Sequence, residues 1–174
     1  MIRKTSLATL TALLLAAPAW ADGFTLTSPD IAEGQQLADA QVFAGFGCEG
    51  GNVAPSLEWS GAPEGTQSYA VTVYDPDAPT GSGWWHWFAF NIPGDVTSLP
   101  GGGAVGGVEL ANDYGVRGFG GACPPPGEVH RYQFTVHALG TVLEIDGSVS
   151  NALAGFMVNA NSLASSTITA VYTR

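Results

Sequence analysis

Residues 68–92 of this 174-residue chain read SYAVTVYDPDAPTGSGWWHWFAFNI, and this stretch decides the fold class. Its two ends, Ser68–Tyr74 and Trp84–Ile92, are rich in the aromatic and β-branched side chains that favour strands. Between them lie Pro76 and Pro79, which lack the backbone N–H that a strand ladder needs. The second run is apolar at nearly every position, so we expect a central strand that is covered on both faces.

The rest of the chain adds short strands and one helix. Further strands are expected at Phe24–Thr27, Leu57–Trp59, Gln133–Leu139 and Ser165–Tyr172, and a Gly-rich loop at Phe43–Asn52. In residues 147–163 apolar side chains recur at spacings of four and three, which indicates an amphipathic helix. These side chains are Val149, Leu153, Phe156, Ala160 and Leu163, and Ser148 or Ser150 would cap the helix. Because strands and helices do not alternate, we predict a single all-β domain over residues 22–174, with Greek-key-like connections and one late helix.

The first 21 residues have the form of a secretory signal. Arg3 and Lys4 precede the mostly apolar run Leu7–Ala17, and residues 19–21 (AWA) form a cleavage site. The apolar run is too short to span a bilayer, and no later run is long enough. We therefore expect an exported protein, periplasmic or secreted, without a transmembrane segment.

The charge of the exported chain restricts its partners. Once residues 1–21 are removed, Arg117, Arg131 and Arg174 stand against all 15 acidic residues, so the net charge is −12 with histidine neutral. Nucleic acids and anionic membrane surfaces bind through cationic patches, so this balance excludes them as general electrostatic partners. One anionic group in a local pocket remains compatible with it.

The two cysteines, Cys48 and Cys123, would meet an oxidising compartment after export. A disulfide between them is the expected outcome, and two buried thiols are the alternative. The sequence has no CxxC or CxxH spacing of the kind that zinc sites use, so no metal or other cofactor is predicted.

Three ionisable side chains are candidates for a site. Asp75 ends a strong strand, where it either faces a cleft or starts the Asp-Pro turn. His86 is flanked by tryptophans and is either a ligand-facing group or a core histidine with a hydrogen-bond partner. His130 begins a strand, and His137, deep in the same strand, is interpreted as a core residue.

Two loops could frame a pocket. Cys123 leads into Pro124, Pro125 and Pro126, a stiff run without backbone donors that the disulfide would pin to the Cys48 loop. It is either the wall of a small-ligand pocket or an ordinary surface loop. Residues 115–121 (GVRGFGG) either turn several N–H groups toward an anion or form a flexible turn. Residues 101–106 match GxGxxG without a strand–helix context and predict no dinucleotide site.

Several motifs together resemble the phosphatidylethanolamine-binding protein family, in particular its bacterial Raf-kinase-inhibitor-like branch. They are DPDAP at 75–79, GWWHW at 83–87, NIP at 91–93, CPP at 123–125 and HRY at 130–132, with FGC at 46–48, GN at 51–52 and NDYG at 112–115. The resemblance extends from about Phe24 to Tyr172, and the order and spacing of these motifs are specific to that family.

The resemblance implies a β-sandwich with a large antiparallel sheet, a smaller sheet and a few helices. It also implies a pocket at one end of the sheet that accepts phosphate-like groups, including phospholipid head groups. Carried over by motif, the ligand-binding residues are Asp75, His86, Pro124, Pro125, His130 and Tyr132, with Gly120 and Gly121 in the facing loop and Asp77, Trp87 and Arg131 in support. The export signal and the cysteines depart from eukaryotic members, so the kinase regulation known in animals does not transfer.

The resulting hypothesis is an exported protein that binds a small anion or phosphate group. Two imidazoles and the Tyr132 hydroxyl would donate to the anion, while Asp75 fixes a histidine tautomer or pairs with an ethanolamine amine. Affinity would be weak and would rise as the histidines protonate. One alternative is a metal-dependent enzyme or hydrolase that uses Asp75, His86 and His130. Another is an inhibitor that meets a protein partner through exposed aromatics among Trp84, Trp85, Trp87 and Phe119.

Overall fold

The large sheet forms the centre of the molecule. The computed structural model describes residues 23–103 and 105–174, so the predicted signal segment lies outside the described residues. Five antiparallel strands pair in the order β10–β9–β5–β6–β8. Their bounds are Ser68–Asp75 for β5, Trp84–Pro93 for β6, Val108–Glu109 for β8, Val129–Leu139 for β9 and Ser162–Thr173 for β10.

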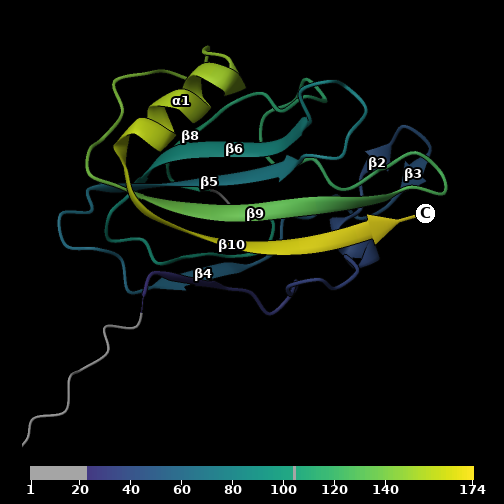
Figure 1. Cartoon of the computed structure of the whole chain (residues 1–174), viewed down its shortest axis with the longest axis horizontal. Coiled ribbons are helices and arrows are strands. Elements are labelled where there is room, and N and C mark those ends of the chain that lie inside the picture. The colour runs from purple at the N-terminus through teal and green to yellow at the C-terminus, as the bar shows by residue number, and fades with distance from the viewer. Residues whose placement is uncertain (1–22, 104) are drawn as a thin grey trace, which may run out of the picture.

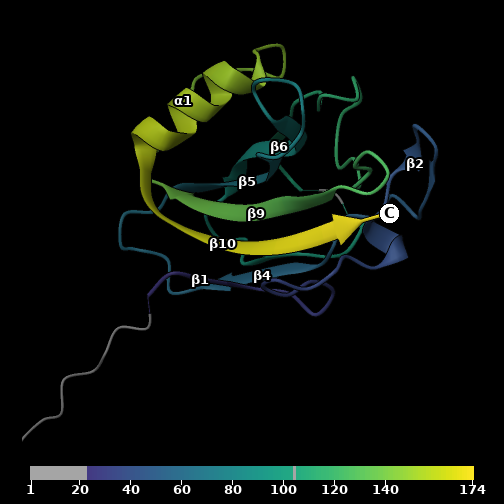
Figure 2. The ribbon, with the colours of Figure 1, turned by 45° about the vertical axis from the view of Figure 1, so that its right-hand side comes forward.

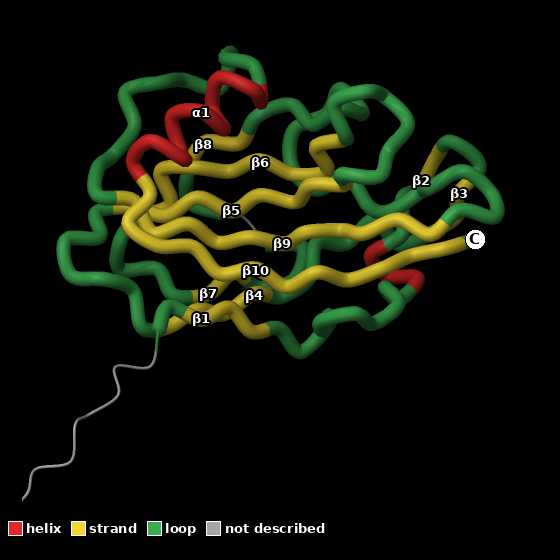
Figure 3. Tube along the Cα trace, in the orientation of Figure 1, coloured by secondary structure: helices red, strands yellow, loops and turns green. Residues whose placement is uncertain are grey.

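Smaller elements complete the sandwich. A second sheet has the order β1–β4–β7, with bounds Thr25–Thr27, Leu57–Ser60 and Ser98–Leu99. It lies against one face of the large sheet, and the helix α1 (Asn151–Asn161) covers the other face (Figures 1 and 2). The predicted Gly-rich loop contains a short hairpin of β2 (Ala44–Gly45) and β3 (Cys48–Glu49), which follows a 3-10 turn at Asp39–Gln41. The all-β class, with a large and a smaller sheet, is confirmed (Figure 3).

The decisive stretch forms the two strands that were predicted from it. β5 lies between β6 and β9, and β6 lies between β5 and β8, so both are central strands. Each has apolar side chains on both faces because each face is covered. One core cluster, which includes Val71, Val73 and Phe134, fills the space between the two sheets. A second cluster, which includes Phe88 and Phe90, lies under α1.

The late helix is confirmed, but the predicted buried face is wrong. Ser150 is the N-cap, and its hydroxyl accepts the Leu153 N–H at 3.2 Å. Leu153 and Phe156 are 46% and 68% exposed, whereas Ala154 and Val158 are buried. Small side chains face the sheet because the large aromatic rings of β6 already fill the space beneath the helix.

The helix also ends earlier than predicted. Leu163 belongs to β10 and is half exposed. His137, interpreted as a core residue, is half buried on the helix side of the sheet, where burial lowers its pKa to about 4. No helix in residues 23–103 or 105–174 is both long and apolar enough to cross a membrane.

Candidate functional site

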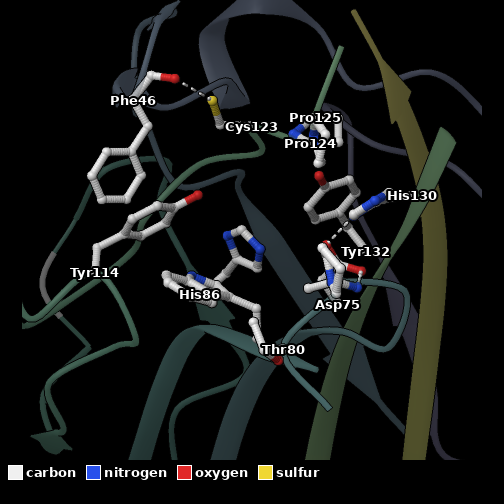
Figure 4. A pocket seen from close by; sticks show the side chains of 13 residues that line it. Phe46, Asp75, Thr80, His86, Tyr114, Cys123, Pro124, Pro125, His130 and Tyr132 are labelled. Atoms are coloured by element: carbon white, nitrogen blue, oxygen red, sulfur yellow. Dashed lines mark hydrogen bonds and ion pairs between the residues drawn. The ribbon is translucent and has the colours of Figure 1, made fainter. Parts of the chain in front are cut away.

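A cavity of about 210 Å³ lies at the end of the large sheet where β5 ends and β9 begins (Figure 4). That volume admits a chemical group rather than a whole drug-sized molecule. It is lined by Phe46, Asp75, Ala78, Pro79, Thr80, Trp84, His86, Tyr114, Cys123, Pro124, Pro125, His130 and Tyr132. Six of the predicted ligand-binding residues are therefore brought together, although they come from three strands and a loop.

The strands supply the polar floor of the cavity, which we define as Asp75, His86, His130 and Tyr132. Asp75 ends β5, His86 lies near the start of β6, and His130 and Tyr132 share one face of β9. The register pairs Asp75 with the first residue of β6 and the preceding residue of β5 with Gln133 of β9. All four floor side chains are buried, so any polar atom without a partner there is costly.

Asp75 performs both roles that the sequence left open. Its Oδ1 accepts the backbone N–H groups of Asp77 at 2.8 Å and Ala78 at 3.1 Å, which fixes the turn after β5. Its Oδ2 lies 2.7 Å from Nδ1 of His130, in the cavity. The carboxylate is thereby an acceptor for three N–H donors.

His130 lies between two carboxylates. Its Nδ1 faces Asp75, and its Nε2 lies 3.0 Å from Oε2 of Glu128, a side chain that is 53% exposed. Burial favours the neutral ring, but the hydrogen bonds to Glu128 and Asp75 outweigh it and raise the pKa of His130. Since both ring nitrogens face acceptors, the ring is an imidazolium that donates from both of them.

The His86 ring, in contrast to that of His130, is neutral. Its Nδ1 lies 2.7 Å from the Gly120 carbonyl oxygen and 3.1 Å from that of Gly121. Carbonyl oxygens only accept, so Nδ1 carries the proton. Burial lowers the pKa of His86, even though these carbonyls oppose the shift, and the ring is neutral at pH 7. Its Nε2 has no partner among the described residues and presents a lone pair.

Two tyrosines flank the His86 ring, whose centroid lies 5.1 Å from that of Tyr132 and 5.6 Å from that of Tyr114 (Figure 4). The Tyr132 hydroxyl is buried and has no hydrogen-bond partner among the described residues. Burial, together with the charge of Asp75, raises the pKa of Tyr132, so the hydroxyl stays protonated. The Tyr114 hydroxyl donates to the Gly121 carbonyl at 3.0 Å.

Loops supply the opposite wall of the cavity, which we define as Phe46, Cys123, Pro124 and Pro125. The predicted disulfide is present, with a Cys48–Cys123 S–S distance of 2.04 Å. Arg174 adds a second connection, because its Nε donates to the Pro124 carbonyl at 2.6 Å and its Nη1 to the Gly47 carbonyl at 2.9 Å. Phe46 is 70% exposed at the rim.

Comparisons with known proteins agree with the fold and the motifs. The sequence model named phosphatidylethanolamine-binding protein matches residues 27–173. The chain belongs to the phosphatidylethanolamine-binding protein family. The protein YbcL of Escherichia coli is 56% identical over 164 residues, which cover 88% of this chain and 90% of YbcL. Its crystal structure superposes with a TM-score of 0.84 and covers 87% of this chain and 98% of that one.

Two more distant relatives extend the comparison. A homologue from Chlamydia trachomatis is 26% identical, with a TM-score of 0.78, and covers 88% of this chain and 99% of its own. LppC of Mycobacterium tuberculosis, named as a candidate lipoprotein, is 39% identical over 131 residues, which are 74% of this chain and 61% of LppC.

The other residues that the family resemblance implied lie outside the cavity lining. Gly120 and Gly121 lie behind His86 and hold its tautomer through their carbonyls. A side chain at Gly121 would collide with the Gln41 carbonyl, so only glycine lets the backbone at position 121 lie this close to Gln41. Trp87 is buried in the core, where its indole donates to Glu109 at 2.8 Å.

Asp77 and Arg131 form an ion pair outside the cavity. The Nη2 of Arg131 lies 2.7 Å from Oδ1 of Asp77, and both the Nε and the backbone N–H of Arg131 donate to Oδ2 at 2.9 Å. These hydrogen bonds lower the pKa of Asp77 to about 2. The pair ties the 75–79 turn to β9, so the predicted supporting roles of both residues concern the frame of the site.

In the glycine-rich loop 115–121, the two amides next to His86 are already engaged within the protein. The Gly120 N–H donates to the His86 carbonyl at 2.7 Å, and the Gly121 N–H donates to Oδ1 of Asn52 at 2.7 Å. Arg117 donates to the Glu109 and Gly147 carbonyls, away from the cavity. Of the described residues that line the cavity, none is an arginine.

Sequence reasoning missed Glu128, Arg174 and the cavity positions of Thr80 and Tyr114. A partial signal existed for Glu128, which stands two residues before His130, the spacing that puts side chains on one face of a strand. Arg174 gave none, because its partners are backbone carbonyls far away in sequence. Among the residues that the structure describes, no group of three or more His, Cys, Asp or Glu side chains is arranged to hold a metal ion.

Proposed function

We propose that this protein is an exported binding protein for a small phosphate-containing group, free or as part of a larger molecule such as a phospholipid head. The observation that carries the proposal is the Tyr132 hydroxyl. It is buried, protonated and without a partner among the described residues, and it faces a cavity of about 210 Å³. A buried donor without an acceptor is costly, and a bound oxygen anion would remove that cost.

The surroundings of the hydroxyl favour a ligand of small size. The neutral His86 ring and the His130 imidazolium lie on either side of Asp75 and Tyr132, while prolines and aromatic rings supply the rest of the surface. A net charge of −12 after export repels anions at long range. Affinity therefore has to come from short hydrogen bonds in a partly dry pocket.

Export is supported by three independent features. Residues 1–21 carry the sequence pattern of a secretory signal. The Cys48–Cys123 disulfide is of the kind that persists in oxidising compartments. A relative, LppC, is named as a candidate lipoprotein. We infer a periplasmic or secreted location from them.

The test is a titration of the mature protein with inorganic phosphate, followed by NMR at the His86 and His130 rings between about pH 5 and 8, the range in which histidine titrates. Saturable shifts at both rings, with affinity increasing toward low pH, are expected. His130→Ala should abolish binding while circular dichroism shows the same fold. Absence of any perturbation at either ring would refute the proposal. Metal analysis of the purified protein tests the enzyme alternative, which a stoichiometric metal ion would favour.

A further inference from the structure

The polar groups that reach the cavity differ in whether they donate or accept a hydrogen bond. His86 presents a lone pair at Nε2, because its Nδ1 proton is fixed by two carbonyls at 2.7 and 3.1 Å. The Tyr114 hydroxyl donates its hydrogen bond to the Gly121 carbonyl, so its oxygen is also left as an acceptor. Two uncharged side chains of the cavity lining carry a buried donor without a partner among the described residues, the hydroxyl of Tyr132 and the indole N–H of Trp84.

Several other donors near the cavity are already engaged. His130 donates to carboxylates from both nitrogens, at 2.7 and 3.0 Å. Pro124 and Pro125 have no N–H, so the loop wall offers no amide at those positions. Arg174, which lies behind this wall, is bonded to two backbone carbonyls. A fully ionised anion would therefore meet two free side-chain donors, on Tyr132 and Trp84, and at least one opposing lone pair, that of His86.

The charges around His86 also disfavour a fully ionised anion. Asp75 faces it from β5 and Asp113 from the 112–115 turn, while His130 approaches from β9 with Glu128 attached. One imidazolium against three carboxylates leaves the neighbourhood negative. A ligand with a single negative charge and a proton of its own suits such a site better than a dianion does.

Resting on the function proposed above, we propose that the cavity selects phosphate monoesters in their singly protonated form. The P–OH of the ligand donates to Nε2 of His86, and the Tyr132 hydroxyl donates to a non-bridging oxygen of the same phosphate. The ligand thus brings the proton, and His86 stays neutral on binding. A sulfate ester, which has the same shape and charge but no proton, leaves the His86 lone pair facing an oxygen.

The test compares methyl phosphate with methyl sulfate on the wild-type mature protein. At about pH 5 both carry one negative charge, because the second pKa of a phosphate monoester is about 6. We expect methyl phosphate to bind at least about tenfold more tightly, the effect of one hydrogen bond lost in a buried site. Between about pH 5 and 8 its affinity should fall, and methylphosphonate, whose second pKa is higher, should keep its affinity to a higher pH.

Nitrogen-15 NMR of the imidazole rings tests the position of the proton directly. With methyl phosphate bound, Nε2 of His86 should remain unprotonated and show the shift of a hydrogen-bond acceptor. His137→Gln, which removes a histidine far from the cavity, should leave both affinities unchanged and serves as the matched control.

The outcomes separate the two proposals. Equal binding of methyl sulfate, with a proton appearing on Nε2 of His86, would support anion binding and overturn the selection of a protonated ligand. Tighter binding of methyl phosphate at about pH 8 than at about pH 5 would overturn it as well. Failure of both esters, and of inorganic phosphate, to bind at any pH would overturn the proposed function itself.

Discussion

The polar floor and the loop wall of the cavity are held in place by different forces. Asp75, His86, His130 and Tyr132 lie at or near the ends of β5, β6 and β9, where the β5–β6 and β9–β10 ladders hold the backbone. Phe46 and the prolines lie in loops that are joined by one disulfide and by the side chain of Arg174. The groups that need exact hydrogen-bond geometry are on the strands, and those that give shape are on loops.

This difference predicts that floor and wall respond separately to substitution. Strand positions share their backbone order with the whole sheet, so they lose it only when the sheet unfolds. Loop positions depend on a few connections, each of which can be removed without touching the sheet. Substitutions in the wall should therefore change ligand access and the shape of head group that the cavity accepts. Substitutions in the floor should change the hydrogen bonds to the ligand.

The largest effect is expected from removing the disulfide. It closes a loop with a sequence separation of 75, so Cys48→Ser combined with Cys123→Ser should lower the free energy of unfolding by about 4 kcal/mol. Urea denaturation measures this loss. In the folded variant, the His130 pKa should keep its wild-type value while amides near Cys123 exchange faster with solvent. An unchanged melting temperature under reducing conditions would contradict the first expectation, and an altered His130 pKa the second.

Asp75→Asn is the corresponding change in the floor. The carboxylate accepts from His130 and from two turn amides, and a hydrogen bond to a charged group contributes about 2 kcal/mol. We expect a loss of that size, a lower pKa of His130, and unchanged amide exchange around Cys123. Asp77→Asn is the matched control, because its ion pair with Arg131 is 27% and 55% exposed and should contribute less than the buried contacts of Asp75. Equal losses for the two variants would show that burial of Asp75 does not matter.

The floor was more predictable from sequence than the wall. Asp75, His86, His130 and Tyr132 stand at strand ends or on strands whose alternation is visible, and family motifs include all four. The wall depends on contacts between residues far apart in sequence, such as Arg174 with Gly47, which no local pattern encodes. The signals there were the cysteine pair, through the oxidising compartment, and the CPP motif at 123–125.

Two other expectations depended on tertiary contacts that the sequence does not show. The apolar spacing in residues 147–163 predicted the helix, but Leu153 and Phe156, which it placed on the buried face, are exposed. The sheet beneath the helix already carries large aromatic rings, so small side chains face it. The expectation that both imidazoles donate to an anion stays a prediction, but in this structure their N–H groups already donate to other acceptors. The Nδ1–H of His86 donates a hydrogen bond to the Gly120 carbonyl, and both ring N–H groups of His130 donate hydrogen bonds to carboxylates. Hydrogen-bond direction depends on these tertiary partners, so a list of residue types cannot predict it.

Arg174→Gln tests the second connection of the wall. It removes two hydrogen bonds from a guanidinium to backbone carbonyls, and we expect a loss of about 1 kcal/mol, since the side chain is partly exposed. Amide exchange should rise at Gly47 and near Pro124, and the histidine pKa values should not change. Arg117→Gln is the control, because it also removes bonds to carbonyls but lies away from the cavity. If both variants loosen the wall equally, Arg174 has no special role in it.

The smallest effect is expected from Glu128→Gln, at the boundary between floor and solvent. Glu128 raises the pKa of His130, so its replacement should lower that pKa, but by less than Asp75→Asn does because Glu128 is 53% exposed. A histidine whose pKa is raised by folding contributes stability below its unfolded pKa of about 6.5, and this contribution disappears as the pH rises through the folded pKa. The loss of stability in the variant, about 0.5 kcal/mol, should thus be present at about pH 5.5 and absent at high pH.

Comparing Glu128→Gln with wild type at each pH is essential, because His86 and His137 act in the opposite direction. Burial lowers the pKa of both, so each one removes stability as the pH falls, and the total profile mixes the two signs. The difference between variant and wild type cancels their contributions and isolates His130. NMR titration of that ring checks the pKa, and urea denaturation checks the stability. A loss that grows toward high pH would mean that Glu128 stabilises the loop before β9 without regard to the charge of His130.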